Sequence, residues 1–164
     1  LREYIEGEPL YKSNKFGYQL GQELKKIHEH YNEKCQFKKF AVNNLLNNAI
    51  EKINTVYQLR GEYFKDFSKN DLINFLQGNK PNDDALIHGD FSLTNILVNN
   101  QKYYYIDLGN VSISTKYFDI YILKKSLKIN DLEEEWEEFL RGYNLDDYNE
   151  IYMRWMELIE LSYN

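Results

Sequence analysis

The sequence predicts a mainly α-helical protein with a small β insert, an α+β fold. Apolar residues recur at helical spacing before residue 80 and again after residue 114. Between these two regions lie three short β-rich runs, "ALI", "NILV" and "YYYID", which turn residues separate. The 164 residues are enough for one domain with its own core.

The first half of the chain predicts three helices. The first has candidate N-caps at Ser13 and Asn14 and an apolar stripe of Phe16, Leu20, Leu24, Ile27 and Tyr31. The second has a longer stripe of Val42, Leu45, Leu46, Ala49, Ile50, Ile53, Val56 and Tyr57. The third lies in "SKNDLINFLQGNKP", where Leu72, Phe75 and Leu76 point inward, Gly78 ends the helix and Pro81 prevents its continuation.

The helical period returns after Ser114. It predicts three further helices over roughly 116–128, 131–141 and 147–161. The polar residues that are candidates for a functional role all lie in the β insert, at strand ends and in the connecting loop. Because loops on a rigid scaffold usually carry chemistry, we expect the functional site there.

Charge and composition restrict the partners. The net charge is −6, and the 11 acidic residues between 130 and 164 are opposed only by Arg141 and Arg154. Such a region repels nucleic acid and suits a small cationic substrate, although a solvated helix face is the simpler interpretation of Glu133 to Glu138. No apolar run approaches the ~20 residues of a membrane span. A single cysteine, Cys35, favours a reducing cytoplasm.

The β insert carries a pattern suited to phosphoryl transfer. "LIHGDFSLTNILV" places Asp90 and Asn95 on one loop, and Asp107 ends the next β-rich run, which a hairpin would return beside Asn95. Phosphoryl transfer needs a carboxylate near the acceptor hydroxyl and hard oxygen ligands for Mg²⁺. Each piece alone is typical of a turn or a strand cap. The combination of His-Gly-Asp, four residues, Asn, and then Asp-x-Gly is specific.

These residues resemble the catalytic and metal loops of the aminoglycoside phosphotransferase and choline kinase superfamily, relatives of protein kinases. Gly89 and Leu108 stand where protein kinases have Arg and Phe, which favours the small-molecule branch. The stretches "YIDLGNVSISTKYFDIYILKKSL" and "LGQELKKIHEHY" are similar to those of aminoglycoside 3′-phosphotransferases. The resemblance covers most of the chain and implies the C-terminal lobe of a protein-kinase-like fold.

The resemblance also implies a role for each residue of the pattern. Asp90 would be the catalytic base, and Asn95 and Asp107 would bind Mg²⁺ with ATP or GTP as the phosphoryl donor. His88 would support the loop by hydrogen bonding. Asp119 opens a helix, where a carboxylate is favoured, and would hold the same loop through its amides. The two remaining histidines are expected to be structural or exposed, namely His28 and His30.

Residues 1–10 resemble the hinge between the two lobes of such kinases, with Leu1, Glu3 and Tyr4 near the adenine. Residues 11–164 would then be the helical lobe that carries the catalytic and metal loops. The nucleotide-covering lobe, with its phosphate hairpin and strand lysine, is expected to be absent from this chain. The fragment alone is therefore expected to bind ATP poorly and to turn over little.

An aminoglycoside antibiotic is the acceptor that the resemblance implies first, and antibiotic resistance the corresponding role. The acidic candidates for binding it are Glu62, Asp131, Glu157 and Glu160. Two departures weigh against this acceptor: Asn110 replaces a common Arg, and Ile129 and Asn130 replace an acidic pair. The alternatives are choline, ethanolamine or a sugar-like metabolite, with aromatic faces around a quaternary ammonium, and a non-catalytic kinase-like remnant.

Overall fold

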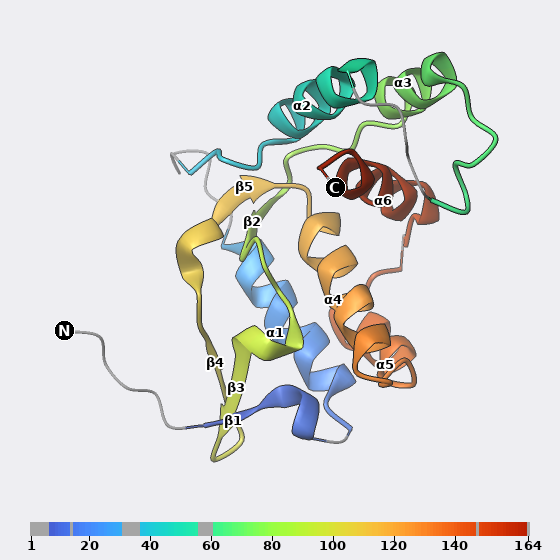
Figure 1. The fold of residues 1–164 in the computed structure, drawn as a ribbon. Coiled ribbons are helices and arrows are strands. Elements are labelled where there is room, and N and C mark those ends of the chain that lie inside the picture. Colours follow the sequence, from blue (N-terminus) through green and yellow to red (C-terminus); the bar gives the residue numbers. More distant parts are fainter. Residues whose placement is uncertain (1–6, 14, 31–36, 56–60, 147, 164) are drawn as a thin grey trace.

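The computed structural model of the chain describes residues 7–13, 15–30, 37–55, 61–146 and 148–163. These residues form a mainly helical fold with two small antiparallel sheets (Figure 1). The helices are α1 (Gly17–Glu29), α2 (Val42–Thr55), α3 (Lys69–Gly78), α4 (Tyr117–Ile129), α5 (Glu135–Tyr143) and α6 (Glu150–Tyr163). The strands are β1 (Glu8–Pro9), β2 (Ala85–Ile87), β3 (Ile96–Asn99), β4 (Lys102–Tyr105) and β5 (Ser112–Ser114).

Residues 85–114 carry four of these strands in a nested arrangement. The outer strands, β2 and β5, pair with each other, and the inner strands, β3 and β4, form a hairpin. The short strand β1 adds to the free edge of β3. The chain thus crosses between the two sheets twice, through loops 88–95 and 106–111. Because strand pairing fixes both ends of both loops, the side chains on them have a defined relative placement.

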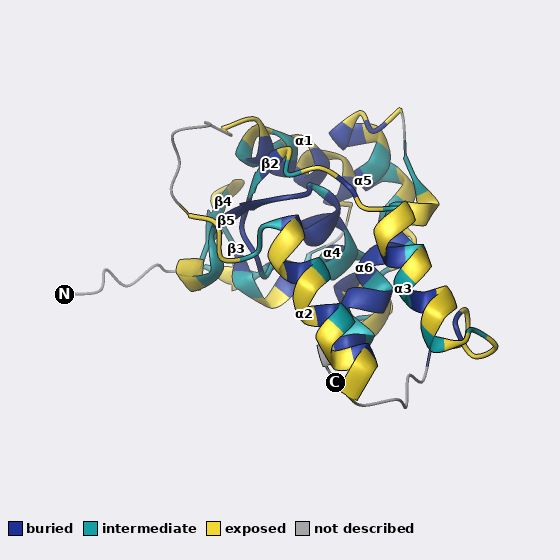
Figure 2. Cartoon of the chain, turned by 90° about the horizontal axis from the view of Figure 1, so that it is seen from above, coloured by how far each residue is buried: buried dark blue, intermediate teal, exposed yellow. Residues whose placement is uncertain are grey.

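Helices α1 and α5 pack at very close range. A Cβ on Gly21 would lie 2.3 Å from the carbonyl oxygen of Phe139, and one on Gly142 would lie 1.9 Å from that of Tyr18. Only glycine allows two backbones to approach in this way. The two helices and α4 form one group around β2 and β5, and β5 is buried along its whole length (Figure 2).

The first turn of α1 is completed by a distant carboxylate. Buried Glu135 accepts hydrogen bonds from the backbone N–H of Lys15 and of Gly17, both at 2.7 Å. The predicted cap at Ser13 is wrong, because this residue ends a preceding 3₁₀ turn, where its N–H binds the carbonyl of Leu10. The other predicted cap, Asn14, lies outside the described residues.

The second helical group consists of α2, α3 and α6, which lie together at one end of the molecule (Figure 1). A capping box starts α3, in which the Ser68 hydroxyl accepts from the Asp71 N–H and the Asp71 carboxylate accepts from the Ser68 N–H. The indole Nε1 of Trp155 donates to the Leu76 carbonyl at 2.9 Å and joins α6 to α3. None of the helices in the described part of the chain combines the length and apolarity needed to cross a membrane.

The predicted fold class is confirmed, and each of the six predicted helices is found. The fifth begins at Glu135 and not near residue 131, because Asp131 has a left-handed backbone (φ 56°) that follows the end of α4. Strands β1 and β5 were not predicted. One of them is only two residues long, and the other, Ser-Ile-Ser, has the composition of a loop. Tyr31, Val56 and Tyr57 lie outside the described residues.

Candidate functional site

The loop after β2 is held by a carboxylate at the start of α4. Asp119 is fully buried, and it accepts hydrogen bonds from the backbone N–H of His88 at 2.6 Å and of Gly89 at 2.9 Å. Hydrogen bonds to an ionised acceptor are the strong ones, and the amino end of a helix favours its charge. The position of Asp90, the next residue, is therefore set by contacts to the backbone on its amino side.

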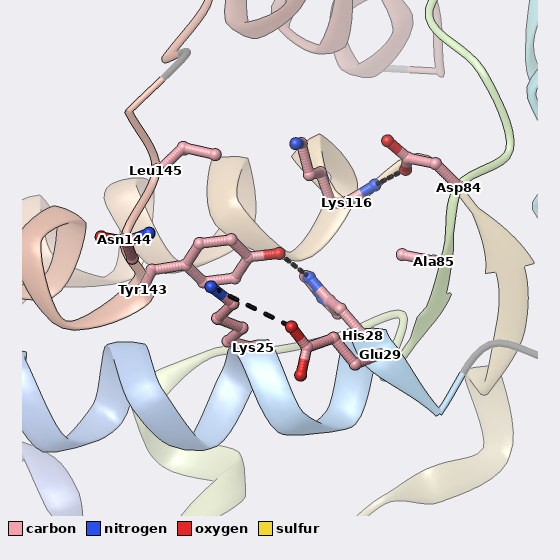
Figure 3. Close-up of a pocket in the computed structure, with 9 residues that line it drawn as sticks. All are labelled: Lys25, His28, Glu29, Asp84, Ala85, Lys116, Tyr143, Asn144 and Leu145. Carbon is pink, nitrogen blue, oxygen red and sulfur yellow. Dashed lines mark hydrogen bonds and ion pairs between the residues drawn. The ribbon is translucent and has the colours of Figure 1, made fainter.

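A buried histidine connects this carboxylate to two more helices. Nε2 of His28 lies 3.2 Å from the Asp119 carboxylate, and its Nδ1 lies 2.7 Å from the Tyr143 hydroxyl (Figure 3). Burial raises the pKa of Tyr143, so its phenol stays protonated. A carboxylate only accepts, so Nε2 of His28 carries the hydrogen of the contact with Asp119. The network thus joins α1, α4 and α5 to the loop.

A cavity of about 380 Å³ opens beside this network. Figure 3 shows Tyr143 and His28 pointing toward each other at its wall, between α1 and α5. Its charged lining residues are of both signs, namely Lys25, Glu29, Asp84 and Lys116. His28 and Tyr143 therefore belong both to the network and to the wall of this cavity.

Asp90 and Asn95 are brought into direct contact. The Asn95 amide nitrogen donates to the Asp90 carboxylate at 2.8 Å and to its backbone carbonyl at 3.0 Å. With Nδ2 committed in this way, Oδ1 is the atom of Asn95 left to bind a cation. The N–H of Asp90 donates to Nδ1 of His88, whose ring lies against those of Phe91 and Tyr105. Both side chains of the pair are partly buried.

The second crossing loop runs beside the first. The N–H of Ile106 donates to the Asn95 carbonyl at 3.0 Å, so the residue after it, Asp107, follows a backbone joined to Asn95. Strand β4 ends at Tyr105, so Asp107 lies beyond the strand and not at its end. Asp107 has a left-handed backbone (φ 58°) and an exposed side chain. Gly89 has φ 82°, and a Cβ there would lie 2.3 Å from the Asn110 carbonyl oxygen. Glycine is required at this position for both reasons.

The donor set fits a magnesium ion. The amide oxygen of Asn95 and the carboxylate of Asp107 are hard ligands, and Mg²⁺ usually takes one or two protein groups and keeps phosphate and water oxygens. Among the described residues no group of three or more His, Cys, Asp or Glu side chains could hold a metal. A metal at these loops would therefore bind through few protein ligands, one of them an amide.

A second cavity, of about 420 Å³, lies between α2, α4 and α6. Its walls are mainly apolar and include the rings of Phe40, Phe118 and Tyr121. Lys39 also lines it, and its Nζ donates to the Asn110 side chain at 2.9 Å. Asn110 in turn lies against Gly89, so the cavity lining is linked to the loop that carries Asp90 through Lys39 and Asn110. We refer to it below as the α2/α4/α6 cavity.

Of the four acidic substrate candidates, only Glu160 lines the α2/α4/α6 cavity. Exposed Glu62 pairs with Lys65, and the carboxylate of Glu157 accepts from Arg154 at 2.8 Å. Asp131 is exposed beyond the carboxyl end of α4. The adenine candidates lie outside the described residues, namely Leu1, Glu3 and Tyr4.

Sequence reasoning missed the roles of His28 and of the cavity walls. His28 and Asp119 are 91 positions apart, and no local pattern relates them. His30 is exposed. The aromatic residues of the cavity come from separate segments, and the only local signal was Phe40 immediately before the apolar stripe of α2.

A family model described as the phosphotransferase enzyme family matches residues 1–158. Among solved structures, an aminoglycoside phosphotransferase from Streptomyces rimosus in complex with ADP and streptomycin matches with a TM-score of 0.69 at 17% identity. The match covers 97% of this chain and 68% of that one. A comparison with curated proteins gave no significant match.

Two further structures have the same fold. A spectinomycin phosphotransferase in complex with ADP and spectinomycin matches with a TM-score of 0.65 at 18% identity, over 97% of this chain and 56% of that one. A choline/ethanolamine kinase family protein from Mesorhizobium loti matches with a TM-score of 0.66 at 15% identity, over 98% and 56%. The chain therefore spans between about half and two thirds of the length of these structures.

Proposed function

Because the chain belongs to the phosphotransferase enzyme family, we propose that it carries the catalytic and metal loops of an enzyme that transfers the γ-phosphoryl group of ATP or GTP to a hydroxyl of a small molecule. One observation supports this most directly. The Asn95 amide donates twice to Asp90, while the Asn95 carbonyl accepts from the residue before Asp107. Three oxygen-bearing side chains thus lie on two adjoining loops.

In this proposal Asp90 is the catalytic base. Its carboxylate, oriented by Asn95, accepts the proton of the acceptor hydroxyl as that oxygen attacks the γ-phosphorus. The bond from the γ-phosphorus to the β,γ-bridging oxygen breaks at the same time, and the nucleoside diphosphate leaves. Asn95 Oδ1 and the Asp107 carboxylate would hold magnesium together with the nucleotide phosphates. When bound, the metal neutralises charge on the phosphate oxygens. Asp119 and His88 support the loop and do not touch the reacting atoms.

The acceptor lies in the α2/α4/α6 cavity, whose lining residue Lys39 is hydrogen-bonded to Asn110 beside Gly89. By family resemblance an aminoglycoside is the first class to test, and similar structures hold streptomycin and spectinomycin. Choline or ethanolamine is the second class, because another similar structure is named for a family of such kinases. Residues 11–164 correspond in this proposal to the lobe that carries the catalytic loop, and residues 1–10 to the hinge.

The test is phosphoryl transfer from labelled ATP with Mg²⁺ in the intact protein, with Asp90→Asn as the variant. We expect kcat to fall by about 10²–10⁴-fold, the usual contribution of a general base, with little change in melting temperature. Asp66→Asn is the control, because Asp66 is exposed and outside the site. Retained turnover in Asp90→Asn would refute the role of Asp90. Absence of transfer to any acceptor would favour the non-catalytic alternative.

A further inference from the structure

The one acidic residue that lines the α2/α4/α6 cavity is already neutralised by its neighbours. One carboxylate oxygen of Glu160 accepts from the Tyr121 hydroxyl at 2.8 Å, and the other is ion-paired with Lys125. Burial and the bond to Glu160 raise the pKa of Tyr121, so its phenol remains a donor. A cationic ligand would have to displace the lysine to gain this carboxylate.

Two of the aromatic rings are also covered by cations of the protein itself. Nζ of Lys39 lies 5.0 Å from the ring centroid of Phe40, and Nζ of Lys125 lies 5.9 Å from that of Tyr121. Phe40 packs in addition against Phe118, with ring centroids 5.1 Å apart. Binding of a quaternary or primary ammonium relies on ring faces that accept a cation. In this cavity one face of Phe40 already contacts Lys39, and one face of Tyr121 already contacts Lys125.

The remaining lining residues are apolar except for Asn48 of α2. Leu45 comes from α2, Ile122 from α4, and Met156 and Ile159 from α6. A cavity of about 420 Å³ is large enough for a small organic molecule. Burying its apolar body there is favourable by roughly 25 cal/mol per Å², and no charge on the ligand is needed for that gain.

We infer that the α2/α4/α6 cavity takes an uncharged alcohol with an apolar body and discriminates against cationic acceptors. The inference rests on the proposed function, in which this cavity holds the acceptor. It replaces the order of acceptors that resemblance suggests, because the carboxylate and two of the three aromatic rings that could bind an ammonium group already contact Lys39 or Lys125. Lys39 adds a further positive charge beside the loop of Asp90.

A matched pair of ligands tests the inference by titration calorimetry. The neutral ligand is 3-phenyl-1-propanol, and phenylalaninol has the same skeleton with one ammonium group added. We expect the neutral alcohol to bind at least about fivefold more tightly, the effect of one unfavourable, partly exposed charge. Kanamycin and choline are expected not to displace it. Binding as tight or tighter by phenylalaninol, displacement by kanamycin or choline, or no binding by either alcohol would each overturn the inference.

Two lysines of α4 provide the matched variants. Lys125→Met removes the partner of Glu160, and we expect the affinity for phenylalaninol to rise by about threefold to fivefold while that for 3-phenyl-1-propanol stays within about twofold. Lys128→Met is the control, because Lys128 is exposed on the same helix and does not line the cavity. An unchanged phenylalaninol affinity in Lys125→Met would contradict the proposed neutralisation of Glu160.

The readout separates this inference from the proposed function. Calorimetry reports binding whether or not phosphate is transferred. If the neutral alcohol binds selectively but no alcohol is phosphorylated with Mg²⁺ and ATP, the proposed function fails and the charge selectivity of the cavity stands. If phosphoryl transfer occurs with kanamycin as the best acceptor, the function stands and the inference fails.

Discussion

Asp119 is the side chain that holds the backbone at the start of the loop after β2. Its buried carboxylate accepts from the N–H groups of His88 and Gly89 and contacts Nε2 of His28. A buried charge is costly unless hydrogen bonds compensate it, and here three donors and the amino end of α4 do so. The same three donors would be left without an acceptor if the carboxylate were removed.

Asp119→Asn is therefore expected to destabilise the protein. The amide NH₂ group that replaces one carboxylate oxygen cannot accept a hydrogen bond. At least one buried donor therefore loses its partner, at a cost of about 1–3 kcal/mol. Asp131→Asn, beyond the other end of α4, is the control, and we expect a change below about 0.5 kcal/mol. Urea unfolding monitored by circular dichroism measures both. Equal stability of the two variants would contradict the role given to Asp119.

At the scale of elements, the packing of α1 on α5 depends on glycine. Helix α1 presents Gly17 and Gly21 to α5, which presents Gly142 in return. A methyl group at Gly21 has no space, because two backbone atoms of α5 lie within 2.5 Å of its position. The two helices would have to move apart, and the distance between Tyr143 and His28 would grow with them.

Gly21→Ala is expected to lower the free energy of unfolding by about 1–3 kcal/mol, the usual cost of overpacking, or by more. Gly78→Ala is the matched control. A Cβ at Gly78 would meet no atom within 4 Å, and alanine stabilises a helix by roughly 0.5–1 kcal/mol relative to glycine. Thermal unfolding of the two variants should thus move in opposite directions. A shift of both in the same direction would contradict the close contact of α1 and α5.

The carboxylate that completes α1 supports a second prediction at this scale. Glu135→Gln leaves one accepting oxygen for the two N–H groups of Lys15 and Gly17. We expect a loss of about 1 kcal/mol, as for other helix caps. The preceding residue gives the control, since Glu134 is exposed and its side chain makes no capping bond. Chemical denaturation measures the free energy of unfolding of both variants, and we expect a larger loss in Glu135→Gln than in Glu134→Gln. A larger loss in Glu134→Gln would exclude the capping role of Glu135.

The whole molecule consists of two helical groups that meet along a seam. Helix α4 of the first group packs on α6 of the second, and the α2/α4/α6 cavity lies in that contact. Trp136 belongs to α5 and Trp155 to α6, so each group contains one tryptophan. A ligand in the cavity touches both groups and should stabilise their contact.

We expect the two groups to unfold together, as a single domain of this size usually does. Variants Trp136→Phe and Trp155→Phe each leave one fluorescent reporter, and in each variant the fluorescence transition should coincide with the circular dichroism transition of the same variant. In the same experiment 3-phenyl-1-propanol should raise the midpoint in both variants. Different fluorescence and circular dichroism midpoints within one variant would show that the seam is weaker than either group.

The sequence predicted what is local and missed what joins distant segments. Asp90, Asn95 and Asp107 lie within 18 consecutive residues, so their residue types and spacing were sufficient to find them. Strand β5 was missed because Ser112 and Ser114 are polar yet buried, as their pairing with β2 requires. Spacing cannot reveal a cap supplied from 118 positions away, nor a cavity whose walls come from three separate segments.

The bond from Gly17 to Glu135 has a consequence for synthesis of the chain. Helix α1 leaves the ribosome before α5, and the carboxylate that completes its first turn, and the glycine face that covers it, follow more than 100 residues later. At a synthesis rate of about 5–20 residues per second, several seconds pass between the appearance of α1 and that of α5. During this time Leu20 and Leu24 of α1 are not covered by α5. We expect a chaperone to bind the chain during this interval, which ends when α5 has left the exit tunnel.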